Sequence, residues 1–465
     1  MNFSTLSTRL GLAAGIAFSG FLTSSVHSAP VLTTLVSFAV TNGANPNGGL
    51  IQGVDGNFYG TTASGGTSNY GTLFRMTPSG SLTNLVSLNH TNGAGPRAGL
   101  TRGTDGSFYG TAYFGGAQNV GTVFKLTTNL VFSALASYAN TNGAYPIGDL
   151  VTGLDGNFYG TTAIGGSNSG GAVIRISAGG ALTPVVSFST GGTNGYNLWG
   201  KMVQTPDGSL YGTTFSGGAY GFGTLFKTTT NGVSTRLYSF GGTSDGANPF
   251  GGLVQGADGN LYGSTYYGGT NGYGTLFRLT TNGGFSTLFS FANTNGANPQ
   301  AALVSGPDGA LYGTTTFGGL YTNGLGEGFG TLFRLTTNGT FTSLVSFAST
   351  NGAGPQAALM VGADGSLYGT TANGGATDQG VVFRLNLAVP TPPVFQSITK
   401  SGDTLALVWS TVGGFTYRIQ SNTNLGTTNW VNLGSAIVAT NSTATISDPV
   451  GPDGQRYYRA VLLLP

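Results

Sequence analysis

Aspartate is the residue capable of acid-base chemistry or metal binding that recurs most regularly in this sequence. Each recurring copy is the first residue of an Asp-Gly dipeptide. The seven copies are Asp55, Asp105, Asp155, Asp207, Asp258, Asp308 and Asp364. A tyrosine follows four residues later each time: Tyr59, Tyr109, Tyr159, Tyr211, Tyr262, Tyr312 and Tyr368. A basic residue also recurs once per repeat: Arg75, Lys125, Arg175, Lys227, Arg278, Arg334 and Arg384. Groups present in every repeat indicate a structural role, with the aspartate bonding its own turn and the basic side chain reaching toward it.

The alternative interpretation of these aspartates is a set of weak calcium loops. Calcium loops use several carboxylate and carbonyl oxygens each, and the repeats lack the further carboxylates. Zinc is excluded because the chain has no cysteine and only two histidines. We therefore expect neither a metal site nor a bound cofactor.

The remaining charges of the repeat region are single residues. They are Asp149, Asp245, Glu327, Asp378, Arg97, Arg102, Lys201 and Arg236. A Ser-His-Asp triad would depend on His90, in a predicted turn. Glycoside hydrolysis would need a carboxylate pair such as Asp149 with Glu327 or Asp245, and no spacing brings them together. Asp245 occupies a slot that is asparagine in other repeats, which favours a turn role. We expect no catalytic residues.

Two slots vary from repeat to repeat, unlike the rest of the pattern. One follows the usual proline: Asn47, Arg97, Ile147, Trp199, Phe250, Gln300 and Gln356. The other ends the second strand: Ser64, Phe114, Ile164, Ser216, Tyr267, Phe317 and Asn373, preceded in three repeats by Tyr113, Phe215 and Tyr266. Drift on exposed loops is one explanation. The other is a saccharide site, because exposed flat rings beside amide side chains suit sugar faces and hydroxyls.

That second explanation gives a specific site hypothesis. Trp199, Phe250, Tyr266 and Tyr267 would contact sugar rings, with Asn47, Gln300 and Gln356 donating hydrogen bonds. Phe317 and Arg97 are further candidate ligand-binding residues. Asp149 and Lys201 break a rule that the first strand of each repeat begins with small residues. They have opposite charges in adjacent repeats, so they are expected to form an ion pair at a channel mouth or to anchor a ligand.

The elements that must position these residues can be read from the fifth repeat. Short strands are predicted at 251–256, 261–267, 275–281 and 285–292, joined by Asp-Gly and Asn-Gly turns and a Gly-rich loop. Seven units spaced by 50 to 56 residues, each with four antiparallel strands, predict an all-β, seven-bladed β-propeller over residues 30–387. Residues 32–42 match the fourth strand and the last unit lacks one, so the N-terminal strand would close the ring.

The two ends of the chain have other patterns. Residues 1–29 are typical of a secretory signal: Arg9, an apolar run from Leu10 to Leu22 and small residues before Ala29. Residues 388–393 form a proline-rich linker, and 394–465 contain strand signals of a small β-sandwich. A net charge of +2 with 6% charged residues provides no basic field for nucleic acid. No later segment is long enough to span a membrane.

These repeats resemble two known groups. The Asp-Gly-Asn turn between inner strands is similar to NHL-repeat and gluconolactonase-like propellers, although the metal-binding carboxylates of those enzymes are lacking. The seven repetitions resemble more closely the GloVer, or choice-of-anchor, repeat family of exported bacterial proteins. Residues 394–465 resemble a fibronectin type III-like module, in which Trp409, the run 417–419, Trp430 and the run 457–459 fall where such domains place core residues. The resemblance implies export and outer-surface display, with an anchoring or sorting role for the C-terminal module, and it supplies no reaction.

Three classes of function follow from the sequence. The first is a surface-displayed binding or adhesion module for glycan or another cell-envelope polymer. The second is a purely structural or adhesive propeller without a small ligand. The third is a carbohydrate-active enzyme. The sequence favours the first class because its varying aromatic and amide slots have no repeated structural role.

Overall fold

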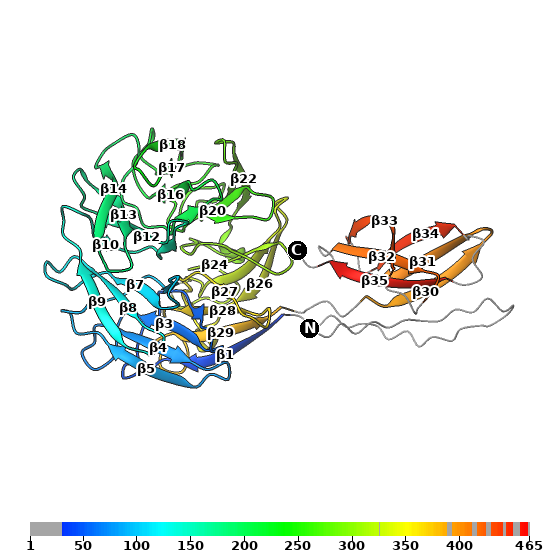
Figure 1. Cartoon of the computed structure of the whole chain (residues 1–465), viewed down its shortest axis with the longest axis horizontal. Helices are drawn as coiled ribbons and strands as arrows, with labels where there is room; N and C mark the ends of the chain where they lie inside the picture. Colours follow the sequence, from blue (N-terminus) through cyan, green and yellow to red (C-terminus); the bar gives the residue numbers. More distant parts are fainter. Residues whose placement is uncertain are drawn as a thin grey trace. The chain divides into compact units, whose positions relative to one another are not determined.

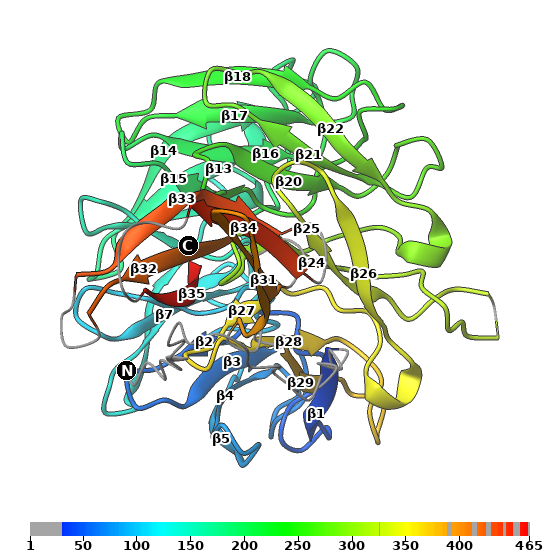
Figure 2. The same ribbon diagram turned by 90° about the vertical axis from the view of Figure 1, so that its right-hand side faces the viewer.

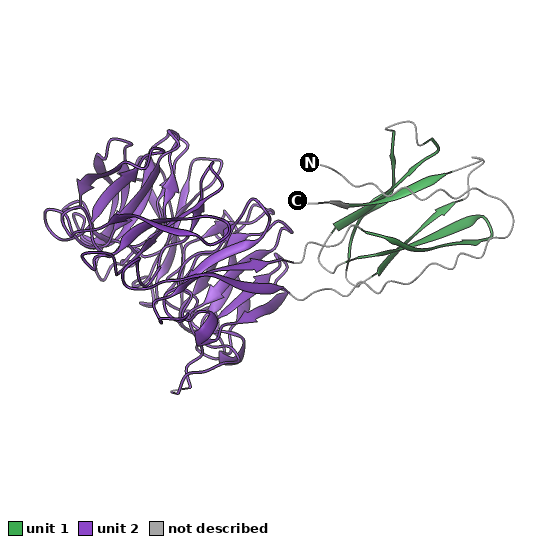
Figure 3. Cartoon of the chain, turned by 90° about the horizontal axis from the view of Figure 1, so that it is seen from below, with its two compact units in different colours: residues 1–29, 388–465 green, residues 30–387 purple. Residues whose placement is uncertain are grey.

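A computed structural model describes residues 30–324, 326–387, 393–411, 416–424, 429–439, 443–449 and 456–463. The predicted signal segment and all of the predicted linker except Pro393 lie outside these residues. The chain divides into a large unit, residues 30–387, and a small unit whose described part begins at residue 393 (Figure 3). The fold is all-β, with two single-turn 3₁₀ helices, η1 (Asn293–Asn295) and η2 (Ser349–Asn351). None of the described helices could cross a membrane.

The large unit consists of seven antiparallel sheets that surround a common centre (Figure 1). The first strands are two residues long: β2 (Ile51–Gln52), β6 (Thr101–Arg102), β11 (Val151–Thr152), β15 (Val203–Gln204), β19 (Val254–Gln255), β23 (Val304–Ser305) and β27 (Met360–Val361). The second strands are β3 (Phe58–Thr62), β7 (Phe108–Ala112), β12 (Phe158–Ile164), β16 (Leu210–Thr214), β20 (Leu261–Thr265), β24 (Leu311–Thr315) and β28 (Leu367–Thr371). One sheet has an additional short strand, β10 (Ala144–Pro146), paired with β12.

Third and fourth strands lie further from the centre. The third strands are β4 (Thr72–Met76), β8 (Thr122–Leu126), β13 (Ser169–Ile176), β17 (Thr224–Thr228), β21 (Thr275–Leu279), β25 (Thr331–Leu335) and β29 (Val381–Asn386). The fourth strands are β5 (Leu82–Ser87), β9 (Phe132–Ser137), β14 (Leu182–Ser189), β18 (Ser234–Ser239), β22 (Phe285–Ser290), β26 (Phe341–Ser346) and β1 (Val31–Ser37). The four strands predicted for residues 251–292 are thus present, each shorter than expected.

The N-terminal strand β1 completes the last sheet. It pairs antiparallel with β29, from Val31 opposite Asn386 to Ser37 opposite Val381 (Figure 2). The last sheet also contacts the first, because the Tyr368 ring lies 4.3 Å from the Phe58 ring. The equivalent tyrosines of the first two sheets contact the following sheet in the same way, Tyr59 on Phe108 and Tyr109 on Phe158. The repeated tyrosine therefore packs each sheet against the next.

Burial along the sheets explains why these residues form strands. Second strands such as β3 are buried at every position, whereas fourth strands such as β5 have only half-buried and exposed positions. Gly60 in β3 is required by packing, since a Cβ there would lie 2.6 Å from the Phe74 ring. The buried hydroxyls of Thr62 and Thr72 bond each other across the ladder at 2.8 Å, so their polar atoms are satisfied.

The Asp-Gly turns have the local role that the sequence predicts. Asp258 accepts hydrogen bonds from the backbone N–H of Asn260 (3.2 Å), from its side-chain amide (2.8 Å) and from the Tyr262 hydroxyl (2.7 Å). The repeated basic residue pairs with the aspartate in three sheets: Lys125 with Asp105, Lys227 with Asp207 and Arg334 with Asp308. The bond from tyrosine to aspartate recurs in six sheets and was not predicted from the sequence.

These contacts set the ionisation of the turn carboxylates. Burial alone would raise the pKa of Asp105, but hydrogen bonds from Lys125, from the Ser107 N–H and from the Tyr109 hydroxyl outweigh it and lower the pKa to about 2. The pKa values of Asp55, Asp155, Asp207, Asp258 and Asp364 are also lowered by hydrogen bonds within their turns.

The small unit contains two three-stranded antiparallel sheets. One has the order β30 (Phe395–Ser401), β31 (Thr404–Ser410), β34 (Thr443–Pro449), and the other β33 (Val431–Val438), β32 (Thr416–Asn422), β35 (Tyr457–Leu463). Trp409, Tyr417, Ile419 and Tyr458 form its core as expected. Trp430 is outside that core, and the guanidinium carbon of Arg459 lies over its ring, 4.3 Å from the ring centre. The strand β30 was not predicted from the sequence.

Candidate functional site

The loop before each first strand carries the first variable slot and is held in one conformation. The residue two positions before the slot has left-handed backbone in every repeat, with φ from 53° to 62°: Asn45, Gly95, Tyr145, Asn197, Asn248, Asn298 and Gly354. Asparagine and glycine tolerate this conformation best. Asn248 and Asn298 also donate side-chain hydrogen bonds of 2.9 Å to the carbonyls of Phe215 and Tyr266 in the preceding sheet. Neighbouring sheets therefore fix the position of each slot.

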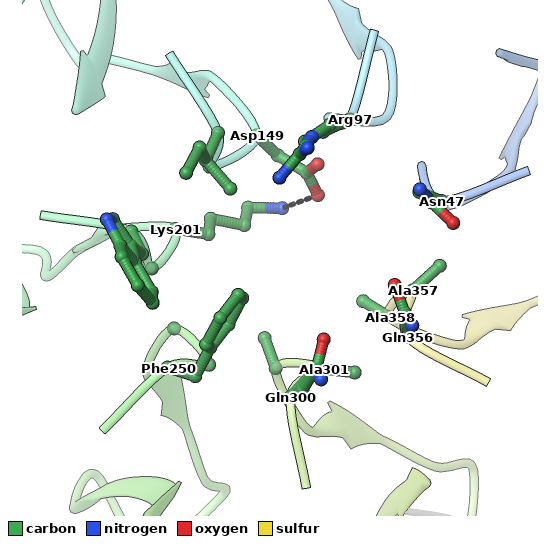
Figure 4. A pocket seen from close by; sticks show the side chains of 18 residues that line it. Asn47, Arg97, Asp149, Lys201, Phe250, Gln300, Ala301, Gln356, Ala357 and Ala358 are labelled. Carbon is green, nitrogen blue, oxygen red and sulfur yellow. Dashed lines mark ion pairs between the residues drawn. The ribbon is translucent and has the colours of Figure 1, made fainter. Parts of the chain in front are cut away.

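All seven residues of this slot line one cavity of about 130 Å³ at the centre of the large unit (Figure 4). We name it the central cavity. Besides the seven slot residues, its lining comprises Asp149, Lys201 and the small residues that lie just before the first strands. Asn47, Gln300 and Gln356 lie on one side of the opening, and Arg97, Asp149 and Lys201 on the other. Residues that vary between repeats thus meet in one place.

Asp149 and Lys201 form the expected ion pair. The Lys201 Nζ lies 3.9 Å from Asp149 Oδ2, and Asp149 Oδ1 accepts a hydrogen bond of 2.6 Å from the Gly99 N–H. Both side chains are only partly buried, so the pair contributes little to stability. Asp149 fixes the start of the neighbouring first strand, while Lys201 keeps donors available to the cavity.

The aromatic residues of the predicted site form a connected chain of rings. Trp199 stacks on Phe215 at 4.0 Å and meets Phe250 edge-on at 4.8 Å. Phe250 is 6.1 Å from Tyr266, and Tyr266 is 4.5 Å from Tyr267. Burial raises the pKa of Tyr266, and Tyr267 raises it further.

The expectation that all these rings are exposed is wrong for three of them. Tyr267 and Phe317 are 49% and 37% exposed, but Trp199, Phe250 and Tyr266 are half-buried. The physical reason is that Phe215 covers one face of Trp199, and each further ring covers part of its neighbour. Only Trp199 and Phe250 of the five line the central cavity, and Tyr266, Tyr267 and Phe317 lie outside its lining.

A second hollow lies beside the central cavity, and the sequence analysis did not find it. This side groove has a volume of about 610 Å³ and shares Asn47, Arg97 and Gln356 with the central cavity. Its other lining residues include Asn69, Tyr70, His90, Phe114 and Asn119. Phe114 belongs to the second variable slot, as do Ser64 and Asn373, which also line the groove. Tyr70 and His90 lie outside both variable slots, so the comparison of those slots did not point to them.

The singular carboxylates have local partners. Asp245 accepts hydrogen bonds from the Gly241 N–H (2.6 Å) and the Tyr238 hydroxyl (2.9 Å). Asn295 bonds the Ala292 N–H in the same way, which confirms that Asp245 is a turn variant. The Glu327 backbone and side chain both bond Asn323 within one loop. In the described part of the chain, no three His, Cys, Asp or Glu residues gather as metal ligands would.

Comparisons with known proteins support the fold and the family. A lectin from Burkholderia pseudomallei superposes with a TM-score of 0.51 at 8% identity, over 75% of this chain and 99% of that chain. A gluconolactonase from Xanthomonas campestris gives a TM-score of 0.40 at 12% identity, over 77% and 90%. No curated protein matches the sequence. The Gloeobacter/Verrucomicrobia repeat matches residues 13–205 and 149–326, which is more than half of the chain. The chain therefore belongs to the Gloeobacter/Verrucomicrobia repeat family.

Proposed function

We propose that the large unit is a seven-bladed β-propeller closed by β1, and that the face bearing the central cavity binds saccharide. Closure is supported by the pairing of β1 with β29 and by the contact of Tyr368 with Phe58. In a closed ring the last sheet has its fourth strand like the others, and the central cavity is a fixed opening. The proposal also includes export of the protein and its display at the cell surface, with the small unit as a fibronectin type III-like anchoring module.

One observation carries the binding proposal. Residues that differ between repeats converge on one cavity, while the residues that recur in every repeat are committed to turns and to packing between sheets. Packing alone would favour the same residue type in each equivalent slot. The cavity instead has an aromatic part, where the Trp199 and Phe250 rings meet at 4.8 Å. Its amide and charged residues lie on different sides of the opening. An apolar ring face beside several hydrogen-bond donors is the combination that a sugar requires.

A glycan array tests this function with the mature chain, by which we mean residues 30–465 without the proposed signal. We expect binding to at least one saccharide, and loss of that binding in Trp199→Ala. The matched control is Leu154→Ala, since Leu154 is 72% exposed in an Asp-Gly turn and lines neither hollow. Because Trp199 is half-buried, its variant should also be melted, to show that the sheets remain folded. Absence of binding to any glycan by the folded wild-type chain would contradict the proposal.

A further inference from the structure

The side groove has the size of a ligand site, whereas the central cavity alone is small. Small-molecule sites commonly have volumes of roughly 300 to 1,000 Å³. The central cavity has about 130 Å³ and the side groove about 610 Å³. The two share Asn47, Arg97 and Gln356, so they form one continuous surface. A ligand that fills both must be extended, as a chain of several sugars would be.

Arg97 lies where the two hollows meet, and its charge has no ion-pair partner among the described residues. Its guanidinium carbon is 4.3 Å from the centre of the Tyr113 ring, and the side chain is exposed. The carboxylate nearest to it in Figure 4, that of Asp149, is bonded to the Gly99 N–H and paired with Lys201. A guanidinium placed over a ring face has no hydrogen-bond acceptor there, so its N–H donors remain available to a ligand.

The charges of the lining residues favour an anion. The described lining of the side groove contains no Asp or Glu, and its one permanent charge is Arg97. The lining of both hollows together contains two positive residues, Arg97 and Lys201, and one negative residue, Asp149, which gives a net charge of +1. This excess lies in a chain that otherwise has little charge, with 6% charged residues.

Tyr145 shows that the surroundings of Arg97 depart from the repeat pattern. It has a φ of 59° at a position occupied by Asn or Gly in the other six repeats. A bulky side chain strains this left-handed backbone conformation. The Tyr145 ring lies 5.0 Å from Tyr113 and 5.7 Å from Phe114, and those two are 4.6 Å apart. The unusual tyrosine therefore completes the ring cluster that supports Arg97.

The groove also offers flat and polar surfaces for sugar rings. Tyr70 and Phe114 are 41% and 40% exposed, and Tyr70 meets His90 edge-on at 5.4 Å. Asn69 and Asn119 each use the side-chain oxygen to accept a backbone N–H, which fixes the orientation of both amides. Exposed rings and fixed amides on one surface match the faces and hydroxyls of a carbohydrate.

We propose that the side groove and central cavity together bind an acidic polysaccharide segment, with a sugar carboxylate paired to Arg97. This inference rests on the proposed saccharide function and specifies its ligand class. A planar carboxylate can accept two parallel N–H bonds from a guanidinium. One unpaired arginine suits one carboxylate per binding segment, whereas a densely sulfated polymer or a nucleic acid would need several cations. Tyr70 and Phe114 would contact the neighbouring sugar rings.

Calorimetric titration of the mature chain tests the inference with matched probes. The probes are an oligogalacturonate and its fully methyl-esterified form, which has the same rings without the charge. We expect the acid form to bind at least tenfold more tightly than the ester. Its binding should weaken as the salt concentration is raised. Arg97→Gln should remove the difference between the two probes. Arg97→Lys should restore it only in part, because the charge returns without the bidentate geometry.

Arg102→Gln is the matched control. Arg102 is an exposed arginine in β6, the strand that follows the loop of Arg97, and it lines neither hollow. It should bind both probes like the wild type. Equal binding of the two probes would overturn the acidic-ligand inference and leave the saccharide function standing. An equal loss in Arg102→Gln, or comparable binding of single-stranded DNA, would also overturn it, because the attraction would then be general. Absence of binding to either probe and to every neutral glycan would overturn both proposals.

Discussion

The bond from the repeated tyrosine to the turn aspartate gives a prediction with an internal control. The Tyr262 hydroxyl donates to Asp258 Oδ2 at 2.7 Å, whereas the Tyr211 hydroxyl makes no hydrogen bond to Asp207. Both tyrosines are completely buried and pack in equivalent clusters. Tyr262→Phe removes a hydrogen bond to a charged acceptor and keeps the ring. Tyr211→Phe removes only an unpaired hydroxyl.

The expected magnitudes follow from that difference. A hydrogen bond to a charged group contributes about 1.5–3 kcal/mol, and the exposed Asp258 side places this one near the low end, at about 1–2 kcal/mol. At roughly 2 °C per kcal/mol for a unit of this size, Tyr262→Phe should lower the Tm by about 2–4 °C. Tyr211→Phe should change the Tm by about 1 °C or less, in either direction, because an unpaired buried hydroxyl contributes nothing favourable.

Differential scanning calorimetry of the mature chain is the assay, with attention to the transition of the large unit. The small unit provides a reference, since neither substitution lies in it. Equal Tm shifts for the two variants would refute the reasoning, because the hydrogen bond would then not distinguish the repeats. A Tyr262→Phe variant as stable as the wild type would show that the Asp258 turn does not depend on this contact.

Three further predictions concern the same framework. Because the pKa of Asp105 is about 2 in the folded chain and 3.8 in the reference state, its paired form stabilises the fold above pH 4 and that contribution is lost as pH falls toward 2. Lys125→Met should reduce this acid dependence in a pH series of melts, and an unchanged profile would contradict the pairing. Deleting residues 32–39 should expose the β29 edge and cause aggregation or non-cooperative melting, whereas a parent-like melt would refute closure by β1. Asp258→Ala should cost roughly 1 kcal/mol in a denaturant titration without any calcium dependence, and a large calcium-induced rise in Tm would instead support metal loops.

The fold could be predicted in detail because the repeats act as an internal alignment. A turn aspartate or strand tyrosine that recurs seven times reveals the scaffold, and the missing fourth strand indicated the pairing of β1 with β29. Strand lengths were overestimated: the first strand of the fifth repeat pairs over two residues only, and Gly251 and Gly252 before it line the central cavity. The strand β30 was missed because it follows the proline-rich segment and has a mixed sequence, FQSITKS.

The site could be predicted only where a slot had equivalents to compare. The slot after the proline identified the lining of the central cavity, including Trp199 and Phe250. Burial of the rings could not be predicted, because the stack of Trp199 on Phe215 joins loops of different strands. The side groove was missed for a similar reason: Tyr70 and His90 become neighbours only after two sheets pack together. Tyr145 did give a signal, as the one bulky residue among asparagines and glycines.

The central claim is that the cavity bearing Trp199 binds saccharide, and a fluorescence titration tests it most directly. The chain has three tryptophans, of which Trp199 lies in the large unit and Trp409 and Trp430 lie in the small unit. Titration of the mature chain with its best glycan should shift the tryptophan emission in a saturable way, because a sugar would cover the open face of Trp199. Trp199→Phe should abolish that shift. A saturable shift that persists in Trp199→Phe would contradict the account, since the responding ring would then belong to the small unit.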